Sequence, residues 1–300
     1  MIEINIFTQK KILIIANFDP NRICGQTIHL NYLKQHFEKQ NSVKLQTTAT
    51  LKEIMEADVI WFRTEKGFLK FLLLCLLFRK AIVYDMSSFP WLELKTTNRS
   101  WLRINTSRYI FKFAAKVAQI RVLSQAMKDY LLEHFDINSE KIFVFYIPVE
   151  LDSNIPRIRT NSQVHFIYVG SDRAWQGLPK LIKAFNQIES EPDFVLHCYG
   201  IKKQNTKNII FHELVSHDQL LSIISKDIDV IVVPRERNDI TEAVMPIKYA
   251  EAIHQGKYIL ATDLKVLHEI ANSKVIFIKN NRVKTLIDGI MAFRSIIFRD

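Results

Sequence analysis

A lysine and a glutamate stand three positions apart in the segment Pro246 to Gln255, where the residue pattern predicts a helix. The proline at its start and Gly256 just after it are typical of the two ends of a helix. Lys248 would lie in the first turn, where unpaired backbone N–H groups and the helix dipole favour an anion. Glu251 would lie along the same face. The pair predicts a phosphate site with a carboxylate beside it, although the same spacing also fits an ordinary ion pair on a helix surface.

The segments that must position this pair form two successions of apolar strands and amphipathic helices. We expect strands where short apolar runs occur, at residues 11–18, 57–63, 80–85, 118–124, 141–148, 164–169, 194–200, 231–233, 257–263 and 274–278. Residues 235–245 are polar and predict a long loop between a strand and the helix of Lys248. Strands that alternate with helices indicate an α/β fold with parallel, doubly wound sheets, which bind ligands beyond the carboxyl ends of their strands.

Length and composition fit two such domains. The chain has 300 residues and is 48% hydrophobic, enough for two cores of ordinary size. The stretch DSNIPRIRTN, from Asp152 to Asn161, is polar, carries Pro156 and has no periodicity. We therefore divide the chain into a first domain over residues 1–155 and a second over residues 156–300.

The spacing Pro246-x-Lys248-x-x-Glu251-Ala252-x-x-x-Gly256, followed by KYILATD, resembles the donor-binding segment of GT-B glycosyltransferases close to family 4. The resemblance implies two Rossmann-like domains that face each other across a cleft, the first for the acceptor and the second for a UDP-linked or GDP-linked sugar. It also implies that Lys248 meets the donor diphosphate, that Glu251 holds the ribose hydroxyls and that transfer retains the anomeric configuration. The acceptor would be a glycan or a lipid-linked intermediate of cell-surface polysaccharide synthesis.

Other positions take expected roles from the same resemblance. Gly170 ends a strand before the loop that grips phosphate, and Val215 lies where backbone groups meet the nucleobase. The first domain would present a loop to the donor phosphates. The remaining donor-binding candidates are Gly25 and Gln26 of that loop, and Ala243 and Val244 before the Pro-x-Lys motif.

Two departures from the family pattern affect the catalytic residues. The family places basic residues where this chain has Ser171 and Gln176, so Arg173 is the candidate cation of that loop. The first of two family glutamates would fall on Ala243, and Glu242 stands one position away as the candidate on the sugar side. These departures leave open a non-catalytic GT-B partner subunit or a small-molecule-binding protein as the alternative to an enzyme.

We expect no tightly bound metal and no cofactor apart from the donor substrate. The sequence Asp227-Ile228-Asp229 is interpreted as a strand edge and not as a metal-binding motif. A nicotinamide-dependent oxidoreductase is disfavoured because no GxGxxG follows a first strand. The three cysteines form no CxxC pair, and we see no signal peptide, so we expect a cytoplasmic protein.

The net charge of +10 calls for an anionic partner. Residues 94–128 contain eight basic side chains and no acidic one, and Ser107 is the expected cap of a helix within them. Residues 68–80 predict an apolar helix too short to span a bilayer. This pattern fits peripheral contact between the first domain and the inner face of an anionic membrane. It fits equally a buried core helix followed by a solvated run of charge. No nucleic-acid recognition motif accompanies the charge.

Overall fold

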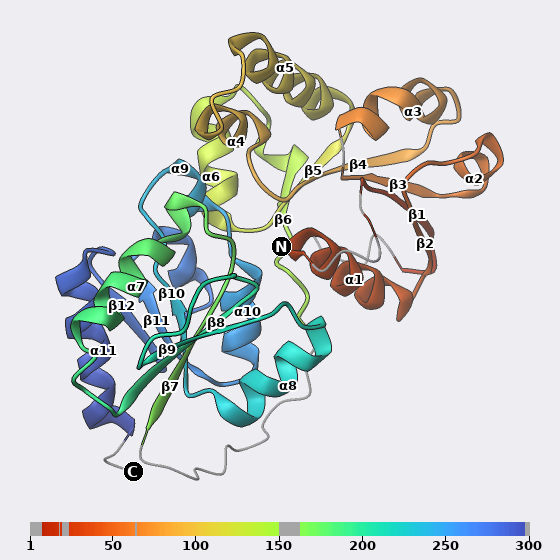
Figure 1. Cartoon of the computed structure of the whole chain (residues 1–300). Helices are drawn as coiled ribbons and strands as arrows, with labels where there is room; N and C mark the ends of the chain where they lie inside the picture. The colour runs from red at the N-terminus through yellow and green to blue at the C-terminus, as the bar shows by residue number, and fades with distance from the viewer. Residues whose placement is uncertain (1–7, 18, 20–23, 64, 150–162, 298–300) are drawn as a thin grey trace. The chain divides into compact units, whose positions relative to one another are not determined.

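The chain folds into two compact units, Met1–Pro148 and Val149–Asp300. The structure is a computed structural model that describes residues 8–17, 19, 24–63, 65–149 and 163–297 (Figure 1). The expected boundary between residues 155 and 156 lies outside the described residues. Each unit holds one six-stranded sheet in which all neighbouring strands are parallel. The expected α/β fold with two Rossmann-like parallel sheets is confirmed.

The first unit alternates strands and helices from residue 11 onward. Its strands are β1 (Lys11–Ile15), β2 (Ser42–Gln46), β3 (Val59–Phe62), β4 (Ala81–Met86), β5 (Gln119–Val122) and β6 (Ile142–Val144). Its helices are α1 (Gly25–Glu38), α2 (Leu51–Glu56), α3 (Glu65–Leu77), α4 (Pro90–Thr96), α5 (Trp101–Val117), α6 (Gln125–His134) and the 3-10 turn η2 (Ser139–Lys141). The strand order is β2-β1-β3-β4-β5-β6, so the sheet grows in opposite directions from β1 and from β3.

Alternate side chains of β1 and β3 face two different helices. Ile14 and Trp61 pack in one cluster with Phe37 of α1. Phe62, the neighbour of Trp61, instead contacts Phe68 of α3, with ring centroids 5.6 Å apart. Because successive side chains of a strand point to opposite faces, α1 and α3 cover opposite faces of the sheet.

The α1 face of this sheet buries a cluster of charged side chains. Asp85 accepts hydrogen bonds from Arg121 Nη1 at 2.8 Å and from Trp61 Nε1 at 3.0 Å. Arg63 Nη1 lies 3.6 Å from the same carboxylate. The ring of His29 in α1 lies between the two arginines, 2.8 Å from Arg63 Nη2 and 2.9 Å from Arg121 Nη1. Two guanidinium groups beside one carboxylate leave the cluster positively charged, which disfavours protonation of the histidine.

The second unit repeats the pattern with a different strand order. Its strands are β7 (Val164–Val169), β8 (Phe194–Tyr199), β9 (Ile209–His212), β10 (Val230–Val233), β11 (Tyr258–Thr262) and β12 (Val275–Ile278). Its helices are α7 (Leu178–Gln187), α8 (His217–Asp227), α9 (Asp239–Ala243), α10 (Ile247–His254) and α11 (Val283–Ile297), with 3-10 turns η3 (Ala174–Gln176) and η4 (Lys265–Glu269). The order β12-β11-β10-β7-β8-β9 is that of a dinucleotide-binding fold, and it reverses between β7 and β10.

One face of the second sheet packs against α7 and α11. Phe166 of β7 contacts Phe185 of α7 and Phe293 of α11, with ring centroids 5.5 Å and 5.6 Å apart. All three side chains are fully buried. Burial of a large aromatic side chain stabilises a fold by roughly 1.5–3 kcal/mol, so this cluster fixes the frame from which the loops at the strand ends extend.

Two expectations about local structure are wrong. Residues 235–245 are not one long loop, because Asn238 caps the short helix α9 by accepting hydrogen bonds from Ile240 N and Thr241 N, both at 3.0 Å. Ser107 does not cap a helix. The helix α5 begins after Ser100, and Ser107 lies inside it with its hydroxyl 2.5 Å from a carboxylate oxygen of Glu65.

The pKa of His29 determines how stability depends on pH. Burial, and after it the charges of Arg63 and Arg121, hold this pKa well below its ordinary value of 6.5. The unfolded chain therefore binds a proton that the folded chain does not, so the free energy of unfolding falls as the pH drops below 6.5. His29→Gln keeps a hydrogen-bond acceptor and should remove up to about 1.4 kcal/mol per pH unit of this dependence. Denaturant titrations at several pH values below neutrality measure the slope.

The control for this change is His134→Gln, at an exposed position on α6. This variant should keep the pH dependence of the wild type. Equal slopes for wild type and His29→Gln would contradict a neutral buried histidine.

Candidate functional site

The second sheet reverses its direction of growth between β7 and β10, which are neighbours in the sheet. Ligands of open α/β sheets bind beyond the carboxyl ends of the two strands at such a point. Two loops start there: residues 170–177 after β7 and residues 234–238 after β10. The candidate site is built from these loops and from the start of α10.

A glycine allows the two loops to come together. Gly177 has φ +80°, and a Cβ atom placed on it would lie 1.7 Å from the carbonyl oxygen of Pro234. Glu236 N donates a hydrogen bond of 2.9 Å to the carbonyl of Trp175. Only a residue without a side chain fits at this approach, so the loop after β7 is held against the loop after β10.

Arg235, the second residue after β10, is a buried cation between these loops. Its Nη1 donates to the carbonyl of Val244 at 3.1 Å, and its guanidinium carbon lies 5.4 Å from the centre of the Trp175 ring. Its Nε is buried without a hydrogen-bond partner. Burial lowers the pKa of Arg235 to about 10, and the only charge interaction that opposes this comes from Tyr168. Among the described residues, no carboxylate forms an ion pair with Arg235.

The start of α10 lies directly after Val244 in the sequence. Pro246 is the N-cap residue, in an extended conformation and without a side-chain cap. Tyr249 N donates to Pro246 O at 3.1 Å, so the N–H groups of Ile247 and Lys248 precede the hydrogen-bonded part of the helix. The dipoles of these N–H groups and the Lys248 ammonium group create a positive potential at the start of α10, next to Val244. The carbonyl of Val244 is the one that Arg235 contacts.

Glu251 joins Lys248 to the helix α8. Its carboxylate is 1% exposed and accepts from Lys248 Nζ at 3.0 Å and from His217 Nε2 at 2.7 Å. Burial raises the pKa of Glu251, but the hydrogen bond from His217 and the charge of Lys248 outweigh it and hold this pKa below its ordinary value. The pair of Lys248 and Glu251 is therefore not an ordinary surface ion pair.

Val215 is tied to the same place through its neighbours. It is partly exposed and stands directly before Ser216, which caps α8 in a capping box with Gln219. The first residue of α8 is His217, whose ring contacts Glu251. The structure thus brings Val215, Lys248 and Glu251 into one region of the second unit.

The candidate residues in and after α9 contact side chains and backbone groups other than Lys248 and Glu251. Glu242 Oε2 accepts from Lys265 N at 2.7 Å, and Oε1 lies 2.6 Å from Arg237 Nη1. Ala243 is buried and ends α9, and the carbonyl of Val244 accepts from Arg235. The Glu242 side chain is 24% exposed beside Arg237.

The loop after β7 is exposed at its start. Gly170 and Arg173 are both exposed, and Arg173 is the N-cap residue of η3. The hydroxyl of Tyr168 donates to the carbonyl of Ser171 at 2.6 Å, which fixes the turn that follows β7. Arg173 lies in the same loop as Trp175, whose ring contacts Arg235. Among the described residues, no carboxylate pairs with the guanidinium of Arg173 and fixes its direction.

The first-unit candidates lie at the start of α1. Gly25 is the first residue of this helix, and Gln26 Nε2 donates to the carbonyl of Asn17 at 3.0 Å, just beyond β1. Asp85, in β4, is buried as the partner of Arg121 and Arg63.

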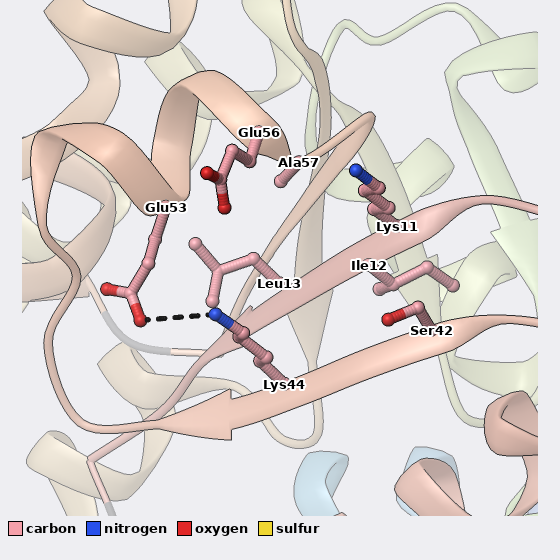
Figure 2. A pocket seen from close by; sticks show the side chains of 8 residues that line it. All are labelled: Lys11, Ile12, Leu13, Ser42, Lys44, Glu53, Glu56 and Ala57. Atoms are coloured by element: carbon pink, nitrogen blue, oxygen red, sulfur yellow. Dashed lines mark ion pairs between the residues drawn. The ribbon is translucent and has the colours of Figure 1, made fainter.

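A small pocket lies at the opposite end of the first sheet (Figure 2). It is formed by the first residues of β1 and β2 and by α2, and its Lys44 and Glu53 form an ion pair of 3.7 Å. Parallel sheets bind their ligands at the other end of the strands. We assign no function to this pocket. Among the described residues, no group of three or more His, Cys, Asp or Glu side chains is arranged to hold a metal ion.

Two residues of the site do not emerge from sequence reasoning. The sequence pattern places Arg235 in a polar loop, although its position just after a strand and Pro234 is a usable signal. The sequence pattern gives His217 no role. Its contact with Glu251 joins residues 34 positions apart, which no local pattern reveals.

Comparison with known proteins finds relatives of this chain. Residues 152–295 match the family model of glycosyl transferases group 1. HepE of Anabaena in complex with UDP has a TM-score of 0.70 at 12% identity, over 97% of this chain and 91% of that chain. Sucrose-phosphate synthase from Thermosynechococcus elongatus has a TM-score of 0.70 at 13% identity, over 95% and 90% of the two chains. A glycosyltransferase from Rickettsia africae has a TM-score of 0.68 at 12% identity, over 96% and 89%. Comparison with curated protein sequences gives no significant match.

These findings identify the class of the protein. Its second unit is a glycosyl transferases group 1 domain, and the chain as a whole has the GT-B fold. The match to this family identifies the protein as a glycosyltransferase.

Replacement of Gly177 tests the contact that joins the two loops. Gly177→Ala should lower the free energy of unfolding by more than Gly200→Ala. Both glycines have positive φ, of +80° and +76°, so they differ only in what an added Cβ would meet. At Gly200 the nearest atom to an added Cβ is Leu214 Cδ1 at 3.3 Å, so the expected loss is the conformational strain of about 1–2 kcal/mol. At Gly177 the clash with the Pro234 carbonyl adds roughly 1–3 kcal/mol. Denaturant unfolding measures both, and equal losses would contradict the close approach.

Proposed function

We propose that the region between β7 and β10 binds the diphosphate of a UDP-linked or GDP-linked sugar, which the enzyme transfers to a glycan or lipid-linked acceptor. The observation that carries this proposal is the buried guanidinium of Arg235, which has no described carboxylate partner. A buried charge without a counterion destabilises a protein, so such a group is usually completed by an ion pair or a ligand. An anionic ligand at this end of the sheet would complete Arg235.

The surroundings of Arg235 favour a diphosphate over a single carboxylate. The carbonyl of Val244 links it to the chain that starts α10, where the first N–H groups and Lys248 add further positive charge. A diphosphate has enough oxygens to meet the guanidinium, the ammonium and the helix N-terminus at once. Arg235 would thereby supply, from the end of β10, the charge that the family places at the positions of Ser171 and Gln176. Arg173 is the second candidate cation.

Glu251 is suited to accept hydrogen bonds from neutral groups such as the ribose hydroxyls. Its carboxylate is held in place by His217 and stays ionised, because these contacts lower its pKa. A donor diphosphate would draw the Lys248 ammonium group away from Glu251, from which it is now 3.0 Å. The oxygen released in this way would accept from the ribose. Backbone groups at Gly170, Val215, Ala243 and Val244 would complete the donor site.

Transfer requires the negative charge that grows on the leaving diphosphate to be stabilised more strongly in the transition state than in the ground state. Lys248, Arg235 and the start of α10 are the groups that would do so. Glu242 is the candidate on the sugar side, held by Arg237 and by Lys265 N. Transfer with retention of the anomeric configuration is the outcome that the family resemblance implies.

The structural neighbours support uridine as the first base to test. HepE forms complexes with UDP and with UDP-glucose. The basic first unit supports an acceptor held at the inner face of an anionic membrane, as in cell-surface polysaccharide synthesis. The engagement of Glu242 by Arg237 favours one alternative, a GT-B partner subunit that binds the donor without transferring it.

Replacement of Arg235 separates donor binding from a structural role. UDP should raise the melting temperature more than UMP, because only UDP carries the diphosphate that Arg235 would contact. A ligand present at a hundred times its Kd adds about 2.7 kcal/mol to the free energy of unfolding. Arg235→Met should weaken UDP binding roughly tenfold to a hundredfold, the contribution of a charged hydrogen bond. The same variant without ligand should melt at or above the wild-type temperature, because an uncompensated buried charge is removed.

Arg294→Met is the matched control. Arg294 also lies over an aromatic ring, that of Phe194 at 5.1 Å, but it is paired with Glu191 at 2.6 Å and Asp193 at 3.1 Å. This variant should melt lower than the wild type and keep the full response to UDP. A lower melting temperature of Arg235→Met with an unchanged UDP response would show that Arg235 is structural.

The stereochemistry of donor cleavage tests the reaction itself. Incubation with UDP-α-glucose or GDP-α-mannose, followed by proton NMR, identifies the anomer that is released first. Retention predicts the α-anomer, and Lys248→Ala and Glu251→Ala should each slow its release by at least roughly tenfold. Initial release of the β-anomer would contradict retention. Stabilisation by UDP without release from any donor would support the non-catalytic alternative.

A further inference from the structure

The helices α3 and α5 carry an apolar surface on the first unit that no described element covers. In α3, Phe68, Phe71 and Cys75 face the sheet and are buried. The outer side holds four leucines at helical spacing: Leu69, Leu73, Leu76 and Leu77 are 50%, 77%, 45% and 69% exposed. A helix on the surface of a protein in water normally presents polar residues there. α3 is therefore not a core helix alone, because one side is buried against the sheet and the other exposes apolar side chains.

The apolar surface continues across α5, which lies beside α3 (Figure 1). The rings of Phe68 and Phe113 are 6.5 Å apart, and Ser107 contacts Glu65 at 2.5 Å. On the outside of α5, large apolar side chains are again exposed. Trp101, Leu102, Tyr109 and Phe113 are 76%, 68%, 69% and 44% exposed. Exposed apolar side chains in this number on two neighbouring helices indicate an interaction surface.

Exposed basic side chains accompany these apolar side chains. On and before α5, the exposed basic residues are Lys95, Arg99, Arg103, Arg108, Lys112 and Lys116. On α3, Lys66 and Lys70 are exposed as well. The sequence from Leu94 to Lys128 has no acidic residue, and the carboxylate of Glu65 in α3 is bound by Ser107. The outer sides of α3 and α5 thus expose apolar and basic side chains together.

This combination selects a lipid surface among the partners of an apolar patch. A second copy of the chain would bring the same basic side chains against one another, and like charges across an interface disfavour association. An anionic bilayer offers hydrocarbon to the leucines, headgroup phosphates to the lysines and arginines, and an interface suited to Trp101 and Tyr109. α3 has 13 residues, and among the described residues no helix is long and apolar enough to cross a membrane. The helices would lie in the plane of the interface.

We propose that the outer sides of α3 and α5 dock the protein on an anionic bilayer. This inference names the surface for the membrane contact included in the proposed function. Its test requires neither donor binding nor transfer, so the two can fail separately.

Sedimentation with vesicles tests the docking surface on the full chain. At low ionic strength, the protein should sediment with vesicles that contain phosphatidylglycerol, and roughly tenfold less with phosphatidylcholine alone. Leu73→Ser with Leu77→Ser should reduce binding to the anionic vesicles by about tenfold, as should Lys112→Glu with Lys116→Glu. Raised salt should weaken binding of the wild type.

Two control variants carry matching changes on the second unit. Lys183→Glu with Lys284→Glu alters the net charge equally, and Leu214→Ser removes a leucine that is 62% exposed. Both should bind vesicles as the wild type does. All variants should melt at the wild-type temperature, because the replaced side chains are exposed.

Three results would overturn the proposal. These are no sedimentation of the wild type at low salt, an equal loss of binding in the control variants, and dimerisation through this surface. The last would appear as a larger species in size-exclusion chromatography that Leu73→Ser with Leu77→Ser converts to monomer.

Discussion

The site of the second unit depends on one close approach, that of Gly177 to the carbonyl of Pro234. The second sheet reverses between β7 and β10, and this contact holds the loops that follow those strands together. Trp175, carried by the first loop, lies over the guanidinium of Arg235, carried by the second. Without the approach, neither the ring nor the cation would be fixed near the start of α10.

The two units treat buried positive charge differently. In the first unit Arg121 and Arg63 have a buried carboxylate, Asp85, as their partner. In the second unit Arg235 is equally enclosed, but its contacts are a carbonyl oxygen and an aromatic ring. A protein can tolerate the first arrangement for stability alone. The second lowers stability unless an anion completes it, which is the usual price of a functional site.

The sequence predicts those parts of the fold that follow from local pattern. Strand β7 has the expected bounds, Val164–Val169, because an apolar run ends at a glycine. The helix of Lys248 is expected within one residue at each end, since proline and glycine bracket it. Ser107 has the residue type of a helix cap, and its packing against Glu65 inside α5 becomes visible only in the structure.

The parts of the site that sequence could not predict depend on contacts between distant segments. The family resemblance points to Lys248 and Glu251, but not to His217, which fixes Glu251 from another helix. It points to Arg173 by its place in the loop. The burial of Arg235 follows from the joining of two loops and becomes visible only in three dimensions. Likewise, composition alone leaves residues 68–80 open between core and membrane surface, and the structure shows one buried and one exposed side.

A crystal structure of the protein with UDP tests the central claim most directly. The account predicts diphosphate oxygens at hydrogen-bond distance, roughly 2.7–3.2 Å, from the first N–H groups of α10 and from the guanidinium of Arg235, with Lys248 turned from Glu251 toward the phosphate. A diphosphate bound elsewhere, or one that leaves Arg235 without an anionic contact, would contradict it.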